Sequence, residues 1–158
     1  MLYFVSMATY QELRKVSSAR LKTVETLIGV NDWDMAGYLM GYVLECALKA
    51  AICRNLKLKE YPDNIKHDKM RNFFITHDFE TLLIVSGMFD IFKLKKRPKR
   101  VLDNWSHFTI YYQSNWTDTR YKPGCWKDTD VKLLYTNLTE TPYGILDILR
   151  NKHFNNPG

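Results

Sequence analysis

The chain has 158 residues, 46% of them hydrophobic and 25% charged, and its formal net charge is +6. A chain of this length can build its own hydrophobic core, so it has no need of disulfide staples. We expect one domain over residues 1–158, with its core at about 9–152.

The cysteines and the hydropathy pattern indicate the cellular compartment. Cys46 and Cys53 lie about 10 Å apart along one predicted helix, too far for a disulfide, and Cys125 is left over. The first seven residues lack the basic start of a signal peptide, and no apolar run approaches the roughly 20 residues of a membrane span. We therefore predict a cytoplasmic protein with no membrane segment.

Positive charge is concentrated in one short segment, residues 93–100 (KLKKRPKR). It holds six cations, and the remaining 17 Lys and Arg are matched by 17 Asp and Glu. A local positive patch attracts phosphate backbones or an acidic protein surface. The candidate phosphate- and nucleic-acid-binding residues are Lys95, Lys96, Arg97, Lys99 and Arg100. The alternative is a solvated turn that is merely basic.

Residues 36–54 (AGYLMGYVLECALKAAICR) predict a central helix, because their apolar positions cover most of the helix circumference. Glu45 and Lys49, one turn apart with the acid first, predict a local ion pair. Before them, Thr9 and Glu12 form a capping box for a helix that ends at Gly29. The two helices are joined by a short turn, so we expect them to be antiparallel.

The rest of the chain also shows helical spacing. Residues 55–70 predict a loop, and residues 76–78 offer caps for a helix that Gly87 weakens. A further helix begins near Pro98 and carries aromatic residues as far as Tyr112. Residues 114–127 predict an ordered loop, and Asp128 begins another helix. We expect Thr141 and Pro142 to start the final helical segment.

Four features in this order resemble the small prokaryotic HEPN domains. They are an acidic helix start before AGYLMGYVLECALKAAI, the segment THDFETLL, an aromatic helix leading into NWTDTRY, and a closing helix. The resemblance spans about residues 31–150. It implies an all-α antiparallel bundle of four to five helices, a homodimer, and a minimal nucleotidyltransferase partner in toxin–antitoxin or phage-defence systems.

The resemblance leaves two kinds of chemistry open. Catalytic members of the family are metal-independent ribonucleases with an Arg followed a few residues later by a His, and other members bind nucleotides or partners. The candidate pairs here are Arg71 with His77 and Arg100 with His107. Positions seven apart on a helix lie within about 20° of each other, whereas positions six apart diverge by about 120°. Arg100 and His107 can therefore share a helix face, but Arg71 and His77 need a turn between them.

Either pair would cleave RNA with no metal or cofactor. The His would exchange a proton with the ribose 2′-hydroxyl or the leaving 5′-oxygen, and the Arg would stabilise charge on the phosphate. For His77, the alternative role is to cap the helix that follows it. No metal site is predicted, because the four histidines are scattered and no CxxC or HExxH motif occurs.

The NWTDTRY segment also has two interpretations. One is packing against the bundle, as the resemblance implies, with Arg120 paired to an acidic group such as Glu45. The other is a nucleotide pocket, in which Trp116 and Tyr121 stack on a base and Arg120 holds a phosphate.

Overall fold

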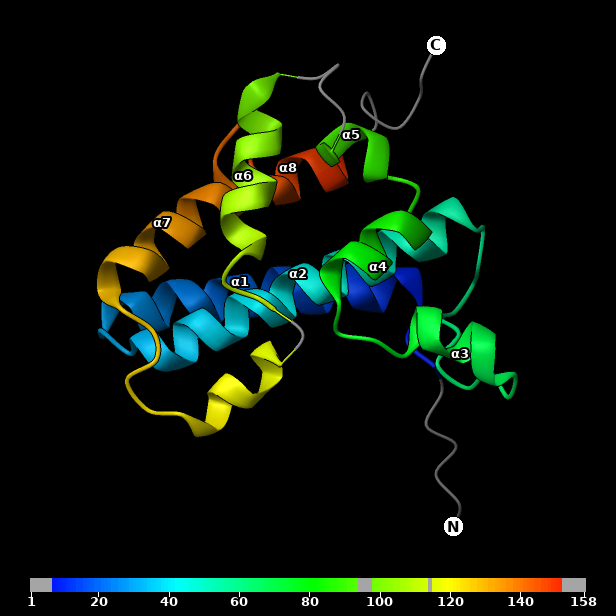
Figure 1. Cartoon of the computed structure of the whole chain (residues 1–158), viewed down its shortest axis with the longest axis horizontal. Coiled ribbons are helices and arrows are strands. Elements are labelled where there is room, and N and C mark those ends of the chain that lie inside the picture. The colour runs from blue at the N-terminus through cyan, green and yellow to red at the C-terminus, as the bar shows by residue number, and fades with distance from the viewer. Residues whose placement is uncertain (1–6, 94–97, 114, 152–158) are drawn as a thin grey trace.

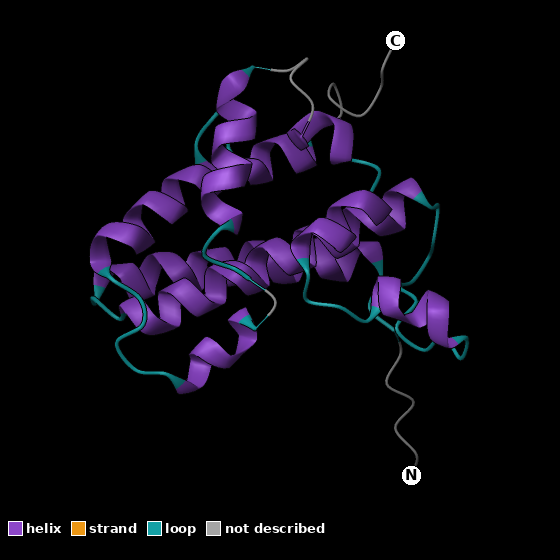
Figure 2. Cartoon of the chain, in the orientation of Figure 1, coloured by secondary structure: helices purple, strands orange, loops and turns teal. Residues whose placement is uncertain are grey.

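The computed structural model describes residues 7–93, 98–113 and 115–151 (Figure 1). Within these ranges the chain is mostly helical and contains no strand (Figure 2), so the predicted all-α class is confirmed. The elements are α1 (Tyr10–Gly29), α2 (Trp33–Asn55), α3 (Asp68–Phe74), α4 (Phe79–Val85), α5 (Phe89–Lys93), α6 (Lys99–Thr109), the 3₁₀ helix η1 (Trp116–Tyr121), α7 (Asp128–Thr139) and α8 (Ile145–Arg150).

The long helices α1 and α2 lie side by side in opposite directions (Figure 1). The predicted capping box begins α1: Glu12 N donates to Thr9 Oγ1 (3.2 Å), and Thr9 N donates to Glu12 Oε2 (2.8 Å). Asp32 caps α2 by accepting a hydrogen bond from Met35 N (3.1 Å). Asn31 makes the turn with a φ of 61°, a left-handed conformation that Asn tolerates better than most residues. Local side-chain chemistry thus sets the boundary between these helices.

As predicted, α2 is the central helix. It contacts α1, α4, α7, α8 and η1, and its buried side chains lie on most of its circumference. By length and composition, α2 is apolar enough to cross a membrane. The expectation that no apolar segment approaches the roughly 20 residues of a membrane span is therefore wrong. Of its most apolar window, 78% is buried inside the fold. A core helix of a soluble protein passes the same test.

Several boundaries differ from those predicted. The expected loop at residues 55–70 already contains the start of α3. Gly87, with a φ of 75°, separates α4 from α5. The aromatic helix α6 ends at Thr109, earlier than predicted. Tyr112 lies beyond that end, where its hydroxyl donates to Gly37 O on α2 (2.7 Å).

The start of the last helix was also predicted too early. Thr141 and Pro142 are joined by a cis peptide bond, and α8 begins at Ile145. Gly144 is its N-cap, at a position where a Cβ atom would overlap the backbone of Glu140. This close backbone approach at the start of α8 requires a residue without a Cβ atom.

Candidate functional site

A network of side-chain hydrogen bonds joins α6 to the end of α7. On α6, Arg100, Asn104 and His107 share one face because they lie about one and two turns apart. Asn137 and Glu140 face them from α7 and its C-cap. The network brings Arg100 and His107, one of the two predicted pairs, into a single arrangement.

At one end of the network, Arg100 and Glu140 form a two-point ion pair. Arg100 Nε donates to Glu140 Oε1 (2.7 Å), and Nη2 donates to Oε2 (2.8 Å). Asn104 Nδ2 also donates to Oε1 (2.6 Å). The hydrogen bond from Arg100 lowers the pKa of Glu140, so this carboxyl is ionised at neutral pH and acts only as an acceptor.

The remaining bonds determine which His107 nitrogen carries hydrogen. Glu140 and the Tyr143 carbonyl can only accept, so the Asn104 amide nitrogen must face them, at 2.6 and 2.9 Å. Asn104 Oδ1 then accepts from Asn137 Nδ2 (3.0 Å), which leaves Asn137 Oδ1 to accept from His107 Nδ1 (2.7 Å). His107 Nδ1 is therefore protonated, and in the neutral ring Nε2 carries the lone pair.

Both asparagines of the network are buried, with exposed fractions of 0% for Asn104 and 5% for Asn137. Arg100, by contrast, keeps a half-exposed side chain, and His107 is partly exposed beside the Tyr111 ring, 5.8 Å between centroids. Buried amides are costly unless they are hydrogen-bonded, as they are here. The two buried asparagines thus hold the His107 imidazole at the surface through a direct hydrogen bond, and the Arg100 guanidinium through a shared carboxylate.

The other predicted pair is not brought together in this way. Arg71 is exposed on α3, and no hydrogen bond or ion pair in the described part of the chain joins it to His77. The capping role considered for His77 is wrong as well. Asp78 caps α4 by accepting from Thr81 N (2.9 Å).

His77 instead contacts the buried carboxylate of Glu45. This carboxylate, 4% exposed, accepts from Lys49 Nζ at one oxygen (2.8 Å) and contacts His77 Nδ1 at the other (2.8 Å). The predicted ion pair with Lys49 is present. The predicted pairing of Glu45 with Arg120 is wrong, since Arg120 is exposed and its guanidinium lies over the Tyr121 ring, 4.7 Å from the centroid.

Within NWTDTRY, the side chains separate into a buried and an exposed group. Trp116 is buried against the Phe79, Tyr38 and Tyr112 rings, and its Nε1 donates to His77 O (2.9 Å). This position matches the packing interpretation and excludes Trp116 from stacking on a base. Tyr121 is 72% exposed.

The basic segment is only partly described. Lys95, Lys96 and Arg97 lie outside the described residues. Lys99 pairs with Asp103 (3.3 Å), as Arg100 does with Glu140. Each of these two described cations therefore has a carboxylate partner, and both cationic side chains remain at least half exposed.

The sequence interpretation missed Asn104, Asn137 and Glu140. A usable signal was present, because Asn104 interrupts the aromatic face of α6 between Arg100 and His107. Asn137 likewise interrupts an apolar face of α7. Two amides within apolar helix faces indicate a buried polar contact between them.

No protein-family model, curated protein or solved structure matches the chain. The candidate site is defined by its own geometry.

Proposed function

We propose that the chain is a HEPN-like helical bundle that binds RNA through the face of α6 and α7. The proposal is supported by the series of hydrogen bonds that connects Arg100 to His107 through Glu140, Asn104 and Asn137. The two residues lie about 10 Å apart along the helix axis, a separation suited to neighbouring parts of an extended ligand. A polymer such as RNA fits this spacing better than a single phosphate does.

RNA binding is tested by fluorescence anisotropy with a labelled single-stranded RNA at two salt concentrations. We expect affinity to fall as salt rises, because phosphate contacts release counterions. Arg100→Gln should weaken binding roughly tenfold or more, since a hydrogen bond to a charged group contributes about 1.5–3 kcal/mol. Lys132→Gln, an exposed change on α7 outside the network, is the matched control. Equal effects of the two changes would contradict the proposal.

A second candidate function, metal-independent RNA cleavage, is favoured by the tautomer of His107. With hydrogen on Nδ1, the Nε2 lone pair is free to take the proton of a ribose 2′-hydroxyl. The 2′-oxygen then attacks the adjacent phosphorus, the bond to the 5′-oxygen breaks, and the leaving oxygen takes a proton from water. The products are a 2′,3′-cyclic phosphate and a 5′-hydroxyl. Arg100 would stabilise the charge that develops on the phosphate.

Cleavage is tested by incubating the purified protein with diverse RNAs in EDTA. His107→Ala should lower the rate by about 10²–10⁴-fold, the usual contribution of a general base, without loss of fold. Mass spectrometry should find cyclic phosphate ends. Intact RNAs after prolonged incubation with the wild-type protein would exclude cleavage and leave the binding proposal standing.

Two further parts of the proposal concern partners. The HEPN resemblance supports a homodimer, which light scattering should report as twice the mass of one chain. It also supports a minimal nucleotidyltransferase partner, tested by co-expression and co-purification with such a protein from an adjacent gene. A purely structural partner module would co-purify in the same way but would neither bind nor cleave RNA.

A further inference from the structure

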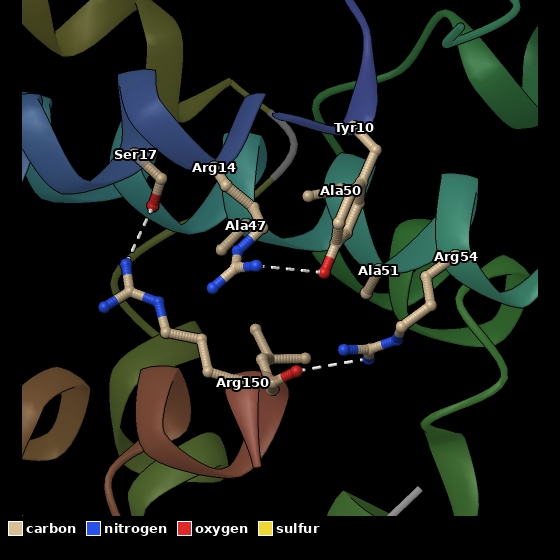
Figure 3. A pocket seen from close by; sticks show the side chains of 9 residues that line it. Tyr10, Arg14, Ser17, Ala47, Ala50, Ala51, Arg54 and Arg150 are labelled. Carbon is tan, nitrogen blue, oxygen red and sulfur yellow. Dashed lines mark hydrogen bonds between the residues drawn. The ribbon is translucent and has the colours of Figure 1, made fainter. Parts of the chain in front are cut away.

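Three arginines from three different helices surround a pocket that none of the functional interpretations uses. Arg14 comes from α1, Arg54 from α2 and Arg150 from α8, and Figure 3 shows their guanidinium groups around one opening. The pocket has a volume of about 80 Å³. It shares no residue with the network between α6 and α7.

The pocket exists because small side chains form its floor. Ala47, Ala50 and Ala51 of α2 lie beneath the opening, where larger side chains would fill the space between α1 and α8. Arg54 helps to hold α8 in place, since its Nη2 donates to Leu149 O (3.1 Å). The pocket therefore lies where three helices pack together, and it is open to solvent on the side of the arginines.

The three arginines lack carboxylate partners in the described part of the chain. Arg14 donates to the Tyr10 hydroxyl at 3.4 Å, and Arg150 contacts the Ser17 and Ser18 hydroxyls at 3.5 and 3.4 Å. These partners are neutral, and the distances are longer than those of strong N–H···O hydrogen bonds. Each guanidinium has five N–H donors, so most of the donors around the pocket remain available.

The positive charge of Arg14 disfavours the charged form of Arg150. Partial burial of this otherwise exposed side chain lowers the pKa of Arg150, and the charge of Arg14 lowers it further, while Asp147 on the same helix opposes this with a smaller effect. Arg100 is different, because it makes a two-point contact with a carboxylate. A group of cations held together without an anion is the arrangement that a bound anion would complete.

From this geometry we infer that the pocket between α1, α2 and α8 binds a phosphate group through Arg14, Arg54 and Arg150. Its volume is well below the roughly 300 Å³ at which pockets begin to enclose a whole drug-sized ligand. The pocket therefore takes one phosphate, either inorganic phosphate or the terminal phosphate of a nucleotide or RNA whose remainder lies outside. This inference is independent of the RNA-binding face on α6 and α7.

The first test is thermal unfolding and calorimetric titration of the whole chain with inorganic phosphate, compared with chloride at equal ionic strength. We expect phosphate to raise the melting temperature of the wild-type protein more than chloride does. Arg14→Gln and Arg150→Gln should each weaken phosphate binding at least tenfold. Arg20→Gln, an exposed change on α1 outside the pocket, should leave binding unchanged.

The stability of the same variants without phosphate separates binding from folding. Neutralising one member of an unpaired cation group relieves repulsion, so Arg14→Gln should melt at or above the wild-type temperature in chloride. Arg14 and Arg150 are both exposed, so neither change leaves a cavity in the core, and Arg14→Gln keeps the test usable if Arg150→Gln does not fold. Phosphate binding that survives Arg14→Gln, or falls equally in Arg20→Gln, would overturn the inference.

The source of the phosphate is tested with pairs of ligands that differ only at that group. AMP is compared with adenosine, and an RNA with a 5′-phosphate is compared with the same RNA ending in a 5′-hydroxyl. A tenfold preference for the phosphorylated member, lost in Arg14→Gln, supports a terminal phosphate. Binding of inorganic phosphate without that preference supports the free ion. If none of these ligands binds, the pocket is not a phosphate site.

Discussion

The buried pair Asn104 and Asn137 offers a quantitative test of the network between α6 and α7. Asn104→Ala removes one hydrogen bond to a carboxylate, one to the Tyr143 carbonyl and one from Asn137. It also leaves the Asn137 amide without its acceptor. At about 1 kcal/mol for a neutral bond and about 1.5–3 kcal/mol for the charged one, we expect a loss of roughly 3–5 kcal/mol of unfolding free energy. Asn137→Ala should cost roughly 2–3 kcal/mol.

A double-mutant cycle isolates the bond between the two amides. Urea unfolding of both single variants and the double variant should show a coupling free energy of about 1–2 kcal/mol, because the shared bond can be lost only once. Asn72→Ala on the exposed side of α3 is the control, with an expected change within about 0.5 kcal/mol. Additive effects of Asn104→Ala and Asn137→Ala, or losses below about 1 kcal/mol, would refute the network.

Two further predictions concern stability. Trp116→Ala should cost about 3–5 kcal/mol in urea unfolding because the ring is buried, whereas Tyr121→Ala should change stability by less than about 0.5 kcal/mol; similar losses would contradict the assigned packing. Arg100 lowers the pKa of Glu140 in the folded protein, so their pairing contributes its full stabilisation at pH values above the ordinary glutamate pKa of about 4.3. This stabilisation is lost as the pH falls through the lowered pKa of Glu140. The stability gap between the wild type and Arg100→Gln should therefore narrow in acid, and a gap that widens there would contradict the pairing.

The sequence was most informative where structure depends on local side-chain chemistry. The capping box at Thr9 and Glu12 and the apolar pattern of α2 each identify their element without reference to distant residues. The end of α6 was not predictable in this way, because the chain that follows it makes a distant contact, the hydrogen bond from the Tyr112 hydroxyl to Gly37 O on α2. Such a tertiary contact overrides local helical spacing.

The candidate sites also combine features that local spacing predicts with features that depend on tertiary packing. The spacing of Arg100 and His107 predicted that they share a helix face, but their support by Asn137 and Glu140 depends on how α7 packs against α6. The arginine pocket was not predictable either. Arg14, Arg54 and Arg150 are far apart in the sequence, and only the packing of α8 against α1 and α2 brings them together.

The central claim is that the network fixes His107 for contact with RNA, and the most direct test is an NMR titration of its imidazole nitrogens. When the His107 imidazole of the ligand-free protein is uncharged, long-range ¹H–¹⁵N spectra should show hydrogen on Nδ1 and a lone pair on Nε2. Adding a single-stranded RNA should shift the His107 resonances, and the Arg100→Gln variant should require more RNA for the same shift. An uncharged His107 ring with hydrogen on Nε2 in place of Nδ1 in the free protein, or His107 resonances that do not move at saturating RNA, would contradict the claim.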